Sequence, residues 1–322
     1  MKDFLRRLFG SSFRAQPPEW ATFFTGRQYA AFITLVTDHL EKQGAPFTVG
    51  DGMIRIGNEG DPEYRQLGLL NLAQKCHLQA ERHWGQIIAN HFTTVEKSQK
   101  EEDALEERLE DFAKVSELLA VRLWPLSYRD QLDDEHLVYR EDLPGVLSVL
   151  VYDLPSTIRN VSPQETEAWE RTKEELFQIA LANVREICIP DVITKDVGDG
   201  VSLTCLVDES YYVASHALLL EHHPDCVGVH GALIGIPHRH AMISYPINDA
   251  GVIRAINRMI PLAFGLEKEG PGSITPNVYW YKGGSFTLLP YELSQKQIVF
   301  TPPEEFTVLL NALAGNEDET NG

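Results

Sequence analysis

The fold of the second half is decided by residues 231–245, which read Gly-Ala-Leu-Ile-Gly-Ile-Pro-His-Arg-His-Ala-Met-Ile-Ser-Tyr. Two apolar runs, 231–236 and 241–245, flank the short polar segment 237–240. This pattern is typical of two antiparallel strands joined by a turn. We therefore predict a β-hairpin whose turn presents His238, Arg239 and His240.

Strand and helix patterns continue on both sides of this hairpin. Apolar and β-branched runs predict further strands at 146–152, 201–207, 278–281 and 286–289. Helical patterns occupy 211–221, 250–264 and 303–314. Ser162, Pro163 and Glu165 form a capping box that begins another helix, which extends to Val184. We therefore predict an α+β protein of two packed halves, the second a mixed or antiparallel sheet with helices on one side.

The first half is predicted to be mostly helical around one small hairpin. A helical pattern over 27–43 ends at Gly44, and two short apolar runs around Gly50 and Gly52 predict a hairpin over 47–56. Further helices are expected after Asp61-Pro62, through Trp84 to Phe92, and over the charged stretch 96–119.

We expect four segments along the chain. They are an N-terminal α+β region over 1–126, a polar linker over 127–145, a C-terminal α+β region over 146–314, and an acidic disordered tail over 315–322. The linker is placed where the chain is polar and acidic and lacks an apolar pattern.

Composition restricts the class of protein. The chain has 322 residues, 43% hydrophobic residues and a net charge of −19, which is typical of an acidic globular protein that repels phosphate backbones and anionic lipids. We therefore expect neither nucleic-acid binding nor stable membrane association. Four widely spaced cysteines and no secretory signal favour buried, reduced thiols and a cytoplasmic location. The opening segment 1–10 is cationic and amphipathic, which predicts a docking helix or a weak membrane anchor.

Titratable side chains concentrate in one stretch. Six of the eleven histidines lie between His216 and His240. If His238 and His240 lie in extended chain, they project from the same face and could bind a divalent metal with a third ligand. His230 is the first candidate for that ligand, and His223, Asp225 and Cys226 are the others. The alternative is that the pair occupies an exposed turn.

Other residues in this region have both a functional and a structural interpretation. His222 and His223 precede Pro224, which favours a helix end, whereas an imidazole there could also act as a general base. Cys226 near His230 raises a nucleophile hypothesis. Tyr279 and Tyr281, in an aromatic strand, could contact a partner or could lie in the core.

The second half resembles the YtpQ-like family of bacterial proteins, a domain family of unknown function. The resemblance rests on the helix 169–184, the Asp199-Gly200 turn, the helix 211–221, the strand 231–237 and the segment 272–281. Similar proteins carry Pro-x-Arg-Asp after the apolar strand, whereas this chain has Pro237-His238-Arg239-His240. The resemblance implies an architecture and leaves the function open.

Two functions are compatible with the sequence. The first is a non-enzymatic protein-interaction or regulatory module without a cofactor, in which His238, Arg239, His240, Tyr279 and Tyr281 contact a protein partner. The second is a metal-dependent hydrolase that uses the histidine cluster over 216–240, with His230, His238 and His240 as possible metal ligands.

Overall fold

The computed structural model describes residues 16–58, 60, 64–131, 136–269, 272–293 and 298–320. The chain forms two compact units, Met1–Glu101 and Glu102–Gly322. Each unit has its own hydrophobic core. The N-terminal amphipathic segment 1–10 lies outside the described residues.

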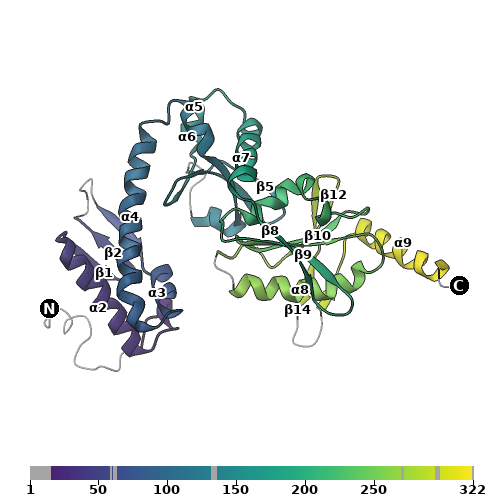
Figure 1. The fold of residues 1–322 in the computed structure, drawn as a ribbon, viewed down its shortest axis with the longest axis horizontal. Helices are drawn as coiled ribbons and strands as arrows, with labels where there is room; N and C mark the ends of the chain where they lie inside the picture. Colours follow the sequence, from purple (N-terminus) through teal and green to yellow (C-terminus); the bar gives the residue numbers. More distant parts are fainter. Residues whose placement is uncertain are drawn as a thin grey trace. The chain divides into compact units, whose positions relative to one another are not determined.

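The first unit is built from helices and a small antiparallel sheet (Figure 1). Its elements are η1 (Glu19–Ala21), α2 (Gly26–Gln43), β1 (Phe47–Gly50), β2 (Met53–Ile56), β3 (Arg65–Gly68), α3 (Leu70–His77), η2 (Glu81–His83) and α4 (Trp84–Glu106), the last of which continues into the second unit. Thr25 caps α2 in a capping box, and Gly44 ends it with a φ of 80°. The predicted hairpin is confirmed by the β1–β2 pairing.

One part of the first unit differs from our prediction. We expected a helix beginning after Asp61-Pro62 and carrying Leu67, and residues 61–63 lie outside the described part of the chain. Leu67 instead pairs with Ile54 in the three-stranded sheet, and the helix α3 begins at Leu70. Cross-strand pairing with an adjacent hairpin therefore determines the conformation of Leu67.

The second unit begins earlier than we predicted, and the segment 127–145 is not a linker. Helix α4 ends at Glu106, and Leu119 begins a buried strand where we expected a helix. The supposed linker contains the strand β5 (Tyr139–Leu143), which pairs with β6 (Val146–Asp153) and buries Leu143. Its polar residues lie beside a strand that is buried along most of its length, so the pairing partner stabilises a strand that has little apolar pattern of its own.

The first sheet of this unit is antiparallel, with the order β4-β6-β5 and with β7 also paired to β6. The elements around it are α5 (Phe112–Val115), η3 (Ser116–Leu118), β4 (Leu119–Pro125), η4 (Leu126–Gln131), β7 (Ile158–Asn160), α6 (Pro163–Glu167) and α7 (Lys173–Ile187). The Ser162 capping box is confirmed. The helix it begins ends at Glu167, and a second capping box at Thr172 begins α7.

The second sheet has six antiparallel strands in the order β13-β12-β10-β11-β9-β8. The strands are β8 (Asp191–Asp196), β9 (Ser202–Val207), β10 (Ala232–His238), β11 (Ala241–Pro246), β12 (Val278–Lys282) and β13 (Ser285–Leu288). The predicted hairpin is confirmed, because Leu233 pairs with Tyr245 and His238 with Ala241. The register shifts between Gly235 and His238, so a bulge lies beside the turn.

Helices cover one face of this sheet, as predicted. Helix α8 (Val252–Glu269) packs against β10 and β11 (Figure 1), and Phe306 of α9 (Glu304–Thr320) packs against Trp280. The opposite face packs on the first sheet and on the 3₁₀ helix η6 (Val213–His222). The remaining elements are η7 (Pro224–Cys226), β14 (Tyr291–Leu293) and β15 (Ile298–Phe300). The α+β class is therefore confirmed, whereas α9 extends to Thr320 through most of the predicted disordered tail.

Candidate functional site

The histidine-rich stretch does not form a single cluster in the folded chain. His216 and His223 lie on and after η6, whereas His238 and His240 lie at the turn between β10 and β11. His230 precedes β10 at the other end of that strand, and the six residue steps from Ala232 to His238 span roughly 20 Å. The three proposed metal ligands His230, His238 and His240 are therefore not brought together. Over the described ranges, no group of three His, Cys, Asp or Glu side chains is arranged to hold a metal ion.

His216 is buried and contacts His223, which is half-buried. Nδ1 of His216 lies 2.8 Å from Nε2 of His223, and Nε2 of His216 lies 3.1 Å from the carbonyl oxygen of Cys188. A carbonyl oxygen only accepts, so Nε2 of neutral His216 carries the proton and Nδ1 accepts from His223. Burial, with the neighbouring His223, lowers the pKa of His216 to about 4. His216 is therefore neutral at physiological pH.

The turn residues His238, Arg239 and His240 are held in place by backbone and side-chain contacts. Nδ1 of His240 lies 3.0 Å from the carbonyl oxygen of Ser210, and Nε of Arg239 donates to Nε2 of His240 at 2.9 Å. The backbone N–H of Arg239 donates to the carbonyl oxygen of Gly272. Burial, with Arg239 nearby, lowers the pKa of His240. These contacts fix the turn and hold the Arg239 side chain beside an aromatic ring from the segment that precedes η6.

That ring is Tyr211, and a second arginine lies against it. The guanidinium carbon of Arg239 is 4.4 Å from the centroid of the Tyr211 ring, and that of Arg122 is 5.4 Å from the same centroid. Arg122 also lies 4.1 Å above the ring of Trp124. We call Arg122, Trp124, Tyr211, Arg239 and His240 the arginine cluster. It joins β4, the start of η6 and the β10–β11 turn.

Arg122 is the unusual member of this cluster. Its residue is only 7% exposed, and it forms no ion pair with any carboxylate in the described part of the chain. Its Nε and the Nε1 of Trp124 are buried without a hydrogen-bond partner among the described residues. Burial and the positive charge of Arg239 lower the pKa of Arg122 to about 10. Arg122 is thus charged at neutral pH and lacks an acceptor, which costs free energy.

Two acids of this unit, Asp153 and Asp208, have other partners. The hydroxyl of Tyr212 donates to Asp153 at 2.7 Å, and the Asp208 carboxylate accepts the backbone N–H of Ser210. Besides burial, Arg239 and nearby tyrosines shift the pKa of Arg122, and Tyr211 shifts the pKa of Arg239. The arginine cluster is therefore a local concentration of positive charge in a chain whose net charge is −19.

His238 and His240 also line a largely apolar groove of about 600 Å³ on the helix-covered side of the second sheet. Its floor includes Ile193, Cys205 and Ile243, and its wall includes Leu262 and Leu266 of α8. Asp191, Lys195, Asp208 and Glu209 are the charged residues of its lining.

Two other predicted contact residues have different environments. Tyr279 is fully buried, and its hydroxyl donates to the carbonyl oxygen of Pro144, so its prediction as a surface contact is wrong. Tyr281 is half-buried against Phe286.

Burial raises the pKa of the Cys226 thiol to about 11, which opposes the nucleophile hypothesis because the reactive form is the thiolate. All four cysteines are buried and unbonded, as predicted.

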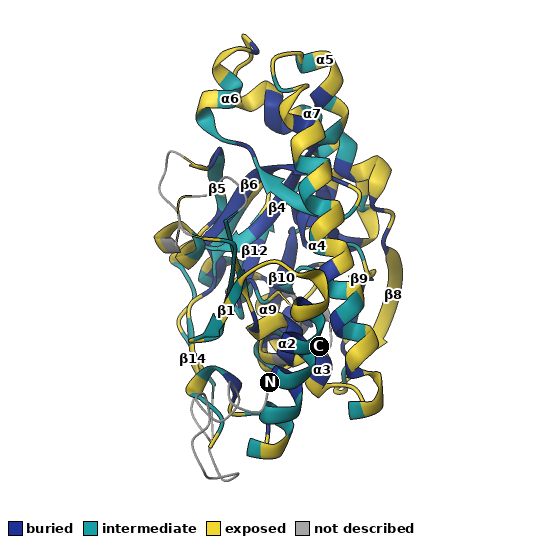
Figure 2. Cartoon of the chain, turned by 90° about the vertical axis from the view of Figure 1, so that its left-hand side faces the viewer, coloured by how far each residue is buried: buried dark blue, intermediate teal, exposed yellow. Residues whose placement is uncertain are grey.

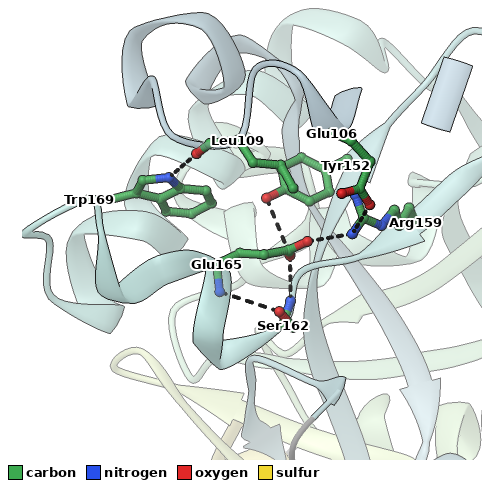
Figure 3. A network of polar contacts seen from close by, with 7 residues as sticks. All are labelled: Glu106, Leu109, Tyr152, Arg159, Ser162, Glu165 and Trp169. Carbon is green, nitrogen blue, oxygen red and sulfur yellow. Dashed lines mark hydrogen bonds and ion pairs between the residues drawn. The ribbon is translucent and has the colours of Figure 1, made fainter. Parts of the chain in front are cut away.

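A second polar network in this unit has a structural role (Figure 3). Arg159 pairs with both Glu106 and Glu165, and the Glu165 carboxylate also accepts the backbone N–H of Ser162. Nε1 of Trp169 donates to the carbonyl oxygen of Leu109 at 2.8 Å. Because each carboxylate here has a partner, this network joins α6 to the end of α4 and to the first sheet.

No protein family, curated protein or solved structure matches this chain. No helix within the described residues combines the length and the hydropathy needed to cross a bilayer.

Proposed function

We propose that this chain is a non-enzymatic interaction module, and that its second unit recognises an oxyanion carried by its binding partner. The observation that carries this proposal is Arg122, which lies beside Arg239, is only 7% exposed, and has a buried Nε without a hydrogen-bond partner among the described residues. We further propose that the partner is a protein, that the chain is cytoplasmic, and that its second half is related to the YtpQ-like family.

The chemistry of the cluster selects a phosphate-type oxyanion. Guanidinium groups present several N–H donors in one plane and bind phosphate or carboxylate oxygens in a bidentate manner. The guanidinium groups of Arg122 and Arg239 offer two positive charges, which suit a doubly charged phosphoryl group better than a single carboxylate. The aromatic rings of Trp124 and Tyr211 stabilise the guanidinium groups by cation–π contacts, but these contacts do not satisfy the N–H donors.

Tyr211 controls access to Arg122. Its ring lies against both guanidinium groups, yet the residue is 46% exposed. An anion that approaches from solvent meets Arg239 and Tyr211 first, and displacement of the Tyr211 ring opens the path to Arg122.

The test is oxyanion binding by the full chain, with inorganic phosphate as the probe. Calorimetric titration and thermal unfolding would be recorded in phosphate, acetate and chloride at equal ionic strength. We expect phosphate to raise the melting temperature, because a ligand that binds only the folded state stabilises it. Arg122→Met and Arg239→Gln should each abolish the increase. Arg258→Met, which removes an arginine paired with Asp199, should leave it unchanged.

A second measurement distinguishes a binding site from a structural arginine. In chloride, Arg122→Met should unfold at a midpoint equal to or above that of the wild type, since replacement of a buried charge without a partner by an apolar side chain relieves its desolvation. A large loss of stability in chloride, or a phosphate effect equal in wild type and Arg122→Met, would contradict the proposal.

A further inference from the structure

The strand β8 is an edge strand that is exposed along its whole length (Figure 2). All six of its residues are exposed, and they include Val192 at 55% and Ile193 at 46%. Ile187 and Ile189, just before the strand, are exposed at 47% and 81%. Val192 and Ile193 thus lie at a sheet edge, where unpaired backbone groups accept another strand, and two further exposed apolar side chains precede them in the chain.

Two common means of protecting an edge strand, a bulge and a proline, are missing from β8, whereas charged side chains are present at Asp191, Lys195 and Asp196. Its pairing with β9 runs from Asp191↔Val207 to Asp196↔Ser202 without a bulge, and the strand contains no proline. Lys195 is the single basic residue on it. A regular edge strand with exposed β-branched side chains is available for pairing with another strand.

We propose that β8 pairs with β8 of a second copy of this chain, in an antiparallel register centred on Ile193. This inference rests on β8 alone and does not depend on oxyanion binding at the arginine cluster. Two copies related by a two-fold axis perpendicular to the sheet keep the same face on the same side. Successive side chains of a strand alternate between the two faces of the sheet. Even-numbered residues of β8 therefore lie opposite even-numbered residues of the second copy, and odd-numbered residues lie opposite odd-numbered ones.

The charges of the strand select this register. With Ile193 opposite Ile193 of the second copy, Asp191 lies opposite Lys195, and the symmetry repeats that pair on the other side. Asp191, Ile193 and Lys195 share the groove face. With Thr194 at the centre, Lys195 would face Ile193 and Asp196 would face Val192, and with Val192 at the centre, Asp191 would face Ile193. Only the Ile193 register places opposite charges together, an arrangement that stabilises cross-strand pairs.

The pairing would also cover the apolar residues that the free edge exposes. Ile193 would contact its own symmetry mate, and Val192 would lie opposite Thr194, which is also β-branched and suits a strand. The two six-stranded sheets would become one continuous sheet, with α8 of both copies on the same face.

Sedimentation velocity of the full chain at increasing concentration, at physiological salt, tests this proposal. We expect a concentration-dependent dimer. Asp191→Lys should weaken dimerisation at least about tenfold, because it places two lysines opposite each other twice in the interface. Lys195→Asp should have the same effect by juxtaposing aspartates. Glu174→Lys, an equal charge change at the start of α7, should leave dimerisation unchanged.

Mixing the two monomeric variants provides the decisive measurement. Asp191→Lys has lysine at both positions and Lys195→Asp has aspartate at both, so a heterodimer restores two opposite-charge pairs. We expect the mixture to associate, and the double variant Asp191→Lys/Lys195→Asp to dimerise by itself. A wild type that stays monomeric at all concentrations, a dimer that persists in Asp191→Lys, or a mixture that does not associate would overturn the proposal. Because β8 is exposed, circular dichroism should show unchanged folding in every variant.

Discussion

Acid should destabilise the second unit through His216, whose side chain is buried and joined to His223 and to the Cys188 carbonyl. The pKa of His216 is lowered to about 4 in the folded chain, first by burial and then by His223. In the unfolded chain, the imidazole titrates near its ordinary value of about 6.5. The unfolded state therefore binds a proton in a pH range where the folded state does not.

The size of the effect follows from proton linkage. Above a pH of about 6.5 both states are neutral at this residue, and stability is unaffected. As the pH falls below that value, the unfolded state gains protons and stability decreases, until the folded state is also protonated near pH 4. Between about pH 7.5 and about pH 5, the expected loss of unfolding free energy is about 2 kcal/mol from this single group. His223, whose pKa is also lowered by burial, acts in the same direction.

Urea titrations at these two pH values measure the effect, with unfolding of the second unit followed by histidine NMR resonances. His216→Gln should reduce the pH-dependent loss by about 2 kcal/mol relative to the wild type. His222→Gln removes an exposed neighbouring imidazole and serves as the matched control. An unchanged pH dependence in His216→Gln, or a His216 resonance that titrates near pH 6.5 in the folded chain, would refute the reasoning.

Two further substitutions test the frame around the sites. Gly231→Ala should lower the free energy of unfolding by at least about 3 kcal/mol, because Gly231 has a φ of 91° and an added Cβ would lie 2.1 Å from the carbonyl oxygen of Tyr281. Gly283 also has a positive φ but has open space around it, so Gly283→Ala should cost less than half as much. Equal urea midpoints for the two variants would contradict this prediction. Tyr212→Phe should cost about 1–3 kcal/mol, since it removes the donor to half-buried Asp153, and it should further raise the pKa of that carboxyl, which an NMR titration would detect.

The parts of the fold that local pattern determines were predictable from the sequence. The hairpin over 231–245, the Ser162 capping box and the Gly44 helix end all depend on residues within a few positions of one another, and all are confirmed. β8 was missed for a physical reason. It is exposed on both faces, so it has no alternation of apolar and polar residues to read.

The candidate site depended on contacts that no local pattern contains. Arg122, Tyr211 and Arg239 come from three separate elements, and only the packing of the two sheets around η6 brings them together. Arg239 and His240 were predicted as binding residues, but Arg122 and Tyr211 were not. The predicted histidine cluster does not form. Its members are near one another in the sequence, but the extended strand β10 separates His230 from His238. The burial of Tyr279 was also not predictable, because an alternating pattern of side chains does not show which face of a strand is buried.

Two arginines of the second unit differ in their charged partners, and this difference supports a binding role for Arg122. Both lie among the elements of the first sheet, Arg122 in β4 and Arg159 in β7. Arg159 has two carboxylate partners, Glu106 and Glu165, although its side chain is 25% exposed. Arg122 is more deeply buried and has aromatic rings and another arginine as neighbours. A structural arginine stabilises the fold through its acids, as Arg159 does, whereas a buried arginine without an acid destabilises the empty protein. We expect an oxyanion to supply the partner that Arg122 lacks, so the same residue should lower stability in chloride and raise it in phosphate.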